Sequence, residues 1–224
     1  MPEPIEFKDK HAVLINGCED QSYTQNLELA YKVFSAYGFS SIQILDCRTA
    51  RLSYPVSDLA SIRNIEVLFT CLSKNIRPED LLFLYTTGHG HRRPDIPKKD
   101  EQQYSTLELI KGELSESELE QLLQDVNPRT AIFLFDQCYG GGFSQRFGKN
   151  GNIAISASGP DAQSQFNTFP QAFFKYFLIT ANSNSRGSIQ DAYEHTLDND
   201  INVLDNSHRP EIHSEIDPAT VFLA

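Results

Sequence analysis

The sequence has no tryptophan, a single methionine, no CxxC pair among its four cysteines and no long apolar run. Its first ten residues lack the apolar core of a secretory signal, and no later stretch approaches the roughly 20 apolar residues that span a bilayer. We therefore expect a cytoplasmic protein that does not enter a membrane. In such a protein, four cysteines without paired spacing are more consistent with free thiols than with disulfides.

Basic residues are also few compared with acidic residues. The chain carries 19 Lys and Arg against 30 Asp and Glu, which gives a formal charge of −11 at neutral pH. A field of this sign repels phosphate, so the charge argues against binding to nucleic acids or anionic membranes. It favours cationic partners or peptides.

The length fits one domain. A chain of 224 residues with 40% hydrophobic and 22% charged residues can bury a substantial core and is ordinary for a globular protein. We see no internal repeat, linker or second domain. We therefore expect a single domain over residues 1–224 with a core at about 11–200.

Short apolar runs alternate with amphipathic stretches along the chain. The pattern predicts five strands at 11–16, 41–46, 81–87, 131–137 and 152–158, with helices near 27–37, 58–72, 169–181 and 188–197 and a further one capped by Ser115 or Ser117. A polar loop is expected after the third strand, with a weak pair of extended segments within 104–114. Apolar strands separated by helices predict an α/β fold with a mostly parallel sheet and helices on both faces.

Two of the predicted strands end in residues that carry chemistry. The strand at 81–87 is followed by Gly88-His89-Gly90, and the strand at 131–137 by Cys138. Because the carboxyl ends of parallel strands share one rim of a sheet, an imidazole and a thiol are expected there together. A histidine that takes the proton of a cysteine produces the thiolate nucleophile that acyl transfer needs.

Glycines flank both residues. They leave the backbone N–H groups of Gly90 and Cys138 open to stabilise the oxyanion of a tetrahedral intermediate. A lone His or Cys at a strand end is more often structural than catalytic. Here, however, the two are separated by 49 positions, near the spacing of about 50 that is typical of caspases.

The two motifs resemble those of clan CD, the group of cysteine peptidases that contains caspases, metacaspases and legumain. The members pair a His-Gly at one strand end with an acidic or amide residue, any residue and Cys at the next, which is Asp136-Gln137-Cys138 in this chain. Legumain is the most similar, because the segment 138–165 follows its pattern of a Gly-rich turn, an Ala-containing strand and a Pro-acidic stretch. The resemblance implies a caspase-like three-layer sandwich and an endopeptidase that cleaves protein or peptide substrates after a selected P1 residue.

The resemblance also implies a substrate pocket. Asp136 would line the S1 site, and another part of its wall would be formed by Ser156, Ala157, Ser158 and Asp161. Legumain-like enzymes carry a basic S1 residue after the first strand, which this chain lacks. Two carboxylates in an acidic protein therefore favour Arg or Lys at P1, with Asn as the other possibility.

No cofactor or metal is expected. The calcium-binding acidic residues of metacaspases are only faintly matched by Asp95, Asp100 and Glu101. His89 and His91 lie on opposite sides of a strand, so with His11 or Cys18 they do not form a tetrahedral set.

Two other functions stay open. The chain could be a catalytically silent caspase-like domain that acts as a binding module or scaffold. Alternatively, the run 139–151, which is rich in glycine, could cradle a nucleotide or phosphate, although it lacks the GxxxxGK[ST] and GxGxxG patterns.

Overall fold

A central β-sheet organises the molecule, whose computed structural model describes residues 4–49, 52–94, 103–164, 168–183, 186–199 and 209–223. Within these residues the sheet has seven strands in the order β10-β9-β8-β4-β1-β2-β3, and neighbours are parallel except for β9 and β10. The strands are Lys10–Asn16 (β1), Ser41–Asp46 (β2), Asp58–Leu59 (β3), Leu81–Thr87 (β4), Thr130–Phe135 (β8), Ile153–Ser156 (β9) and Glu211–Ser214 (β10). The predicted mostly parallel sheet is confirmed.

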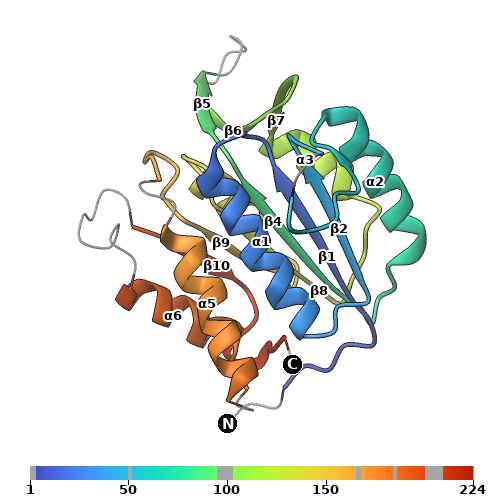
Figure 1. Ribbon diagram of the computed structural model, residues 1–224, viewed down its shortest axis with the longest axis vertical. Helices are drawn as coiled ribbons and strands as arrows, with labels where there is room; N and C mark the ends of the chain where they lie inside the picture. Colours follow the sequence, from blue (N-terminus) through green and yellow to red (C-terminus); the bar gives the residue numbers. More distant parts are fainter. Residues whose placement is uncertain are drawn as a thin grey trace.

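Helices cover both faces of this sheet (Figure 1). One face carries Gln21–Ala36 (α1), Thr168–Asn182 (α5) and Ile189–Asn199 (α6), and the other carries Ile62–Asn75 (α2), Glu116–Leu123 (α3) and Gly141–Phe147 (α4). Each face has its own apolar core, and β4, between them, is buried along its whole length. The fold is therefore a mixed α/β three-layer sandwich, as the alternating apolar and amphipathic segments predict.

A small antiparallel sheet stands above the end to which β4 points (Figure 1). It consists of Gly90–Pro94 (β5), Gln103–Leu109 (β6) and Gly112–Ser115 (β7), in that order. The prediction of a polar loop directly after β4 was therefore wrong for residues 91–94 and 103, whereas the pair of extended segments predicted within 104–114 is confirmed by β6 and β7. Leu107 and Leu114 bury their side chains against the α2 and α3 face, which holds this hairpin to the main sheet.

The strand β10 and the helix α4 had no sequence prediction, whereas β3 occupies the first residues of the helix predicted at 58–72, so that prediction was wrong at its start. The strands β3 and β10 are edge strands of two and four residues, too short for a periodic pattern. Helix α4 forms within the glycine-rich run, because Phe143 and Phe147 bury their rings against Phe133 and Phe135 of β8. Tertiary packing thus overrides the low helix propensity of glycine.

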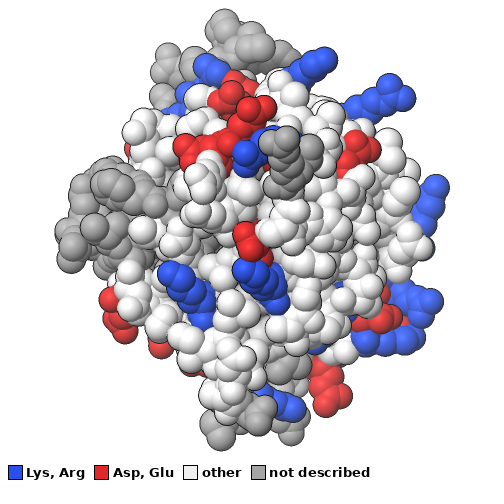
Figure 2. Space-filling model, viewed as in Figure 1, with Lys and Arg blue, Asp and Glu red and all other residues white. Residues whose placement is uncertain are grey.

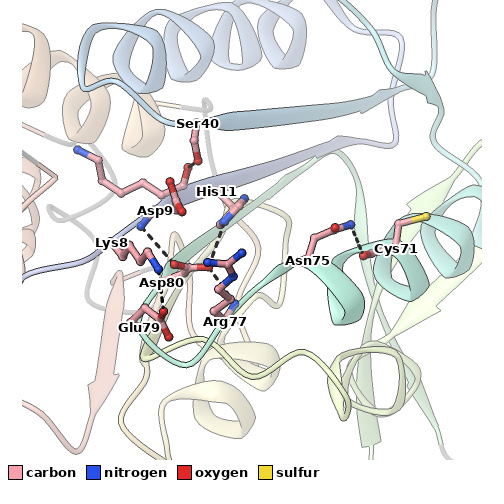
Figure 3. A network of polar contacts seen from close by, with 10 residues as sticks. Lys8, Asp9, His11, Ser40, Cys71, Asn75, Arg77, Glu79 and Asp80 are labelled. Carbon is pink, nitrogen blue, oxygen red and sulfur yellow. Dashed lines mark hydrogen bonds and ion pairs between the residues drawn. The ribbon is translucent and has the colours of Figure 1, made fainter.

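A polar network closes the end of the sheet where β1 and β4 begin (Figure 3). The carboxylate of Asp80 accepts the N–H groups of Asp9 at 3.2 Å and Arg77 at 2.8 Å, and it lies 3.4 Å from the Nε2 atom of His11. His11 is therefore engaged at the end of β1 opposite to the one that is followed by Cys18.

All four cysteines are free thiols, as predicted. Cys18 and Cys47 are half-buried, whereas Cys71 is exposed on α2. Within the described ranges, no helix has the length and apolar character needed to cross a membrane.

Candidate active site

The ends of β4 and β8 lie next to each other. Thr86 is opposite Phe135 in the parallel register, and the N–H of Asp136 donates to the Thr86 carbonyl at 2.9 Å. Both strands run toward the same rim, so the residues that follow them, His89 and Cys138, emerge there together.

Gly90 contacts the backbone of the nucleophile candidate. A Cβ atom at this position would collide with the carbonyl oxygen of Cys138 and approach Cβ of Gln137 to 3.0 Å. Only glycine allows the segment that follows His89 to pass this close to the loop that carries Cys138. The Gly90 amide, predicted as one half of an oxyanion hole, therefore lies beside the thiol.

The turn that contains Cys138 has an unusual backbone. Tyr139, which follows the cysteine, has a φ of 61°, in the left-handed region that bulky residues rarely adopt. Its N–H donates to the carbonyl of Ala162 at 2.8 Å, and its hydroxyl accepts from Gln163 at 3.2 Å. Strained residues of this kind concentrate at functional sites.

The thiol of Cys138 is half-buried and donates to the carbonyl of Ser164, with the sulfur 3.7 Å from the oxygen. Burial raises its pKa and the negative charge of Asp136 adds to the rise, while hydrogen bonds with backbone groups that include those of Gly90 and Cys138 itself oppose it. The unliganded site therefore favours the thiol, although the amides that would stabilise an anion are already in place.

The imidazole of His89 is exposed on the rim. It packs against Tyr23 of α1 in an edge-to-face arrangement, with ring centroids 5.7 Å apart and planes at 84°. Among the residues that the structure describes, the ring has no hydrogen-bond partner.

Asp136 lies beneath the rim and is 1% exposed. Its carboxylate accepts from the hydroxyls of Thr87 at 2.7 Å and Tyr85 at 3.2 Å, and from the amide of Asn26 at 3.5 Å. The candidate S1 carboxylate is thus held by neutral donors from β4 and α1.

The other predicted wall residues divide into three kinds of environment. Ser156 points toward α4, where its hydroxyl lies 3.0 Å from that of Ser144, and Ala157 packs in the core under α1 and α5. Ser158 is fully buried, and its hydroxyl has no partner among the described residues. Asp161 is exposed and forms an ion pair with Arg92 of β5.

Sequence reasoning missed Tyr23, Arg92 and Arg48 as components of the rim. Arg48 follows β2, and its guanidinium donates to the hydroxyl of Thr24 in α1. These residues are far from His89 and Cys138 in sequence, with the exception of Arg92. For two of them the position in the chain was an available signal. Arg48 lies just after the carboxyl end of β2, and Tyr23 lies in the first turn of the helix that follows β1.

The described residues contain no group of three or more His, Cys, Asp or Glu that could hold a metal ion. Asp95, Asp100 and Glu101 lie outside the described residues. Within the glycine-rich run proposed as a phosphate cradle, Gly141 allows close packing, because a Cβ atom there would collide with the backbone of Gly159 and Pro160.

Comparison with known proteins adds a fold and no function. No protein-family model matches the chain, and no curated protein is significantly similar to it. The crystal structure of protein GSU0716 from Geobacter sulfurreducens is similar in fold, with a TM-score of 0.66 and 15% sequence identity over 95% of this chain and 96% of that one.

Proposed function

We propose that this chain is a cysteine endopeptidase of the caspase–legumain type. The sulfur of Cys138 attacks the scissile carbonyl carbon while His89 takes the thiol proton, and the N–H groups of Gly90 and Cys138 hold the oxyanion. The C–N bond then breaks as His89 returns the proton to the leaving amine. Water hydrolyses the resulting thioester and regenerates the thiol.

The contact between Gly90 and the carbonyl of Cys138 carries the proposal. In this contact the backbone of Gly90, which directly follows the proposed base His89, lies against the backbone of the proposed nucleophile Cys138. The left-handed backbone of Tyr139, directly after Cys138, also supports the proposal, because strained backbone conformations concentrate at functional sites.

A basic P1 residue remains the preferred substrate. Asp161 already binds a guanidinium, that of Arg92, and the rim also carries the exposed Glu19 and Asp20. Acidic side chains gather near the start of α1 in Figure 2. A peptide with Arg or Lys at P1 would therefore meet charge complementarity at this rim. The proposed setting is the cytoplasm, with no cofactor.

An active-site probe tests the function. Peptidyl acyloxymethyl ketones with Arg, Lys, Asn or Asp at P1 are incubated with the wild type, Cys138→Ala and Cys71→Ala, and labelling is followed by intact mass. We expect labelling by the Arg or Lys probe that is lost only in Cys138→Ala. The absence of labelling with every P1 residue would reject the peptidase.

A silent scaffold is the second candidate, and one observation favours it. The Cys138 thiol donates to the Ser164 carbonyl, and burial raises its pKa, which favours the protonated form of the sulfur. A scaffold would fold normally and would leave every probe unreacted.

A further inference from the structure

Tyr23 provides the ring contact of the candidate base. It lies in the first turn of α1, is only 9% exposed and meets the His89 imidazole edge to face at 5.7 Å. An exposed histidine rotates freely about its two side-chain torsions unless a neighbour fixes it. No described residue forms a hydrogen bond to this imidazole, so the orienting contact has to come from packing.

The first turn of α1 is itself well fixed. Asp20 caps the helix by accepting the N–H of Ser22 at 2.8 Å and its hydroxyl at 2.7 Å. One turn after Tyr23, the amide of Asn26 reaches the buried carboxylate of Asp136. The helix start is therefore tied to the loop of the nucleophile on one side and carries the aromatic contact to the base on the other.

The pKa shifts of two neighbouring groups also reflect the closeness of His89 and Tyr23 to the start of α1 and to Tyr85. Hydrogen bonds from Ser22 lower the pKa of Asp20 most, and His89 contributes to the lowering. Burial raises the pKa of Tyr85 most, followed by the charge of Asp136, and Tyr23 adds to it. Tyr23 therefore contacts the imidazole and lies close enough to Tyr85 to affect the pKa of its hydroxyl.

We propose that Tyr23 is a positioning residue for His89: its ring holds the imidazole plane so that the nitrogen faces the sulfur of Cys138. This inference rests on the proposed peptidase function. A ring contact that fixes a base preserves the effective concentration of the reacting groups, and small displacements of such groups reduce rates steeply. The contact acts on the chemical step and leaves peptide binding unchanged.

The test uses Tyr23→Phe, which keeps the ring, and Tyr23→Leu, which removes it. Tyr31→Leu is the matched control, because Tyr31 lies on the same helix and packs against Tyr54, away from the rim. We expect Tyr23→Leu to lower kcat at least tenfold with KM within twofold, and Tyr23→Phe and Tyr31→Leu to stay within threefold of the wild type. An equal loss in Tyr23→Leu and Tyr31→Leu would overturn the proposal.

Two further measurements do not need turnover. In NMR spectra, the ring-current shift of the His89 imidazole protons is expected to disappear in Tyr23→Leu and persist in Tyr23→Phe. Alkylation of Cys138 by iodoacetamide is expected to slow in Tyr23→Leu when His89 is present and to be insensitive to Tyr23 in a His89→Ala background. An unchanged imidazole shift in Tyr23→Leu rejects the contact, whereas intact NMR and alkylation effects in a protein without peptide cleavage would reject the peptidase function and retain the contact.

Discussion

Because Gly90 has no side chain, the segment that follows His89 can contact the loop that carries Cys138. Gly90 lies against the carbonyl oxygen of Cys138, so the approach of β5 to the nucleophile loop leaves no space for a Cβ atom. This backbone contact places the two amides of the proposed oxyanion hole next to each other, and the carbonyl of Cys138 cannot relax as a flexible side chain could to accommodate an added carbon.

Replacing Gly90 by alanine is therefore expected to disable the site. The collision involves backbone on both sides, so we expect a loss of about 1–3 kcal/mol of unfolding free energy, as for overpacked cores, and loss of Cys138 labelling by the P1 probe. Urea denaturation and intact mass measure the two effects. In the control Gly159→Ala, the added Cβ meets only the flexible end of Glu211, with Oε1 at 3.1 Å, and both quantities should stay near those of the wild type.

The half-buried thiol of Cys138 is expected to make the free energy of unfolding fall at alkaline pH. Burial raises the pKa of Cys138, so the folded chain keeps a proton that the unfolded chain loses above the ordinary thiol pKa of about 8.5. Stability therefore falls as pH rises through that value. We expect Cys138→Ser to lose less unfolding free energy than the wild type between pH 7.5 and pH 10, measured by urea denaturation. Cys71→Ser, which changes an exposed thiol, should behave like the wild type, and equal losses in all three proteins would contradict the prediction.

At the scale of secondary-structure elements, the parallel sheet and the positions of His89 and Cys138 could be predicted because long apolar runs and strand ends are local signals. The run 81–87 became β4 without a change of bounds. Helix α4 could not be predicted, since its glycine-rich sequence has low helix propensity and its stability comes from the packing of Phe143 and Phe147 against the rings of β8. The contact between Tyr23 and His89 could not be predicted either, because neither segment's sequence indicates which turn of a helix packs against which strand end.

The ion pair between β5 and the loop after β9 affects substrate preference. Arg92 occupies the carboxylate of Asp161, which the proposal assigns to substrates with a basic P1 residue. We expect Arg92→Ala to lower KM for an Arg-P1 peptide about twofold to tenfold by releasing this carboxylate, and Asp161→Asn to raise it. Steady-state kinetics with a fluorogenic peptide measure both.

The neighbouring Arg93 provides the control. It pairs with Glu113 of β7, away from the loop after β9, so Arg93→Ala should leave KM unchanged. A similar fall in KM in Arg92→Ala and Arg93→Ala would show that general charge, and not the release of Asp161, controls binding.

At the scale of the whole molecule, the formal charge of −11 creates a long-range field in addition to the local contacts. Such a field accelerates the association of cationic ligands and is screened by salt, with a Debye length of about 10 Å at 0.1 M. For a substrate with several Lys or Arg residues, we expect kcat/KM to fall severalfold between 0.05 and 0.5 M NaCl. A substrate with the same P1 residue and a neutral remainder should change little, and equal salt dependence would argue against steering by the field.

The pairing of β4 with β8 also has a consequence for how this protein could be divided. The chain passes from α3 to β8 through a turn in which residues 124, 125, 127 and 129 are exposed. Everything before the turn contains β1 to β7 and the base, and everything after it contains β8 to β10 and the thiol. The two portions meet at the β4–β8 pairing in the main sheet, so neither portion alone contains both residues of the proposed dyad. If the proposed peptidase function holds, a gene split at this turn is expected to encode two halves without activity that regain it only when β4 and β8 pair, so the fold would suit a complementation reporter.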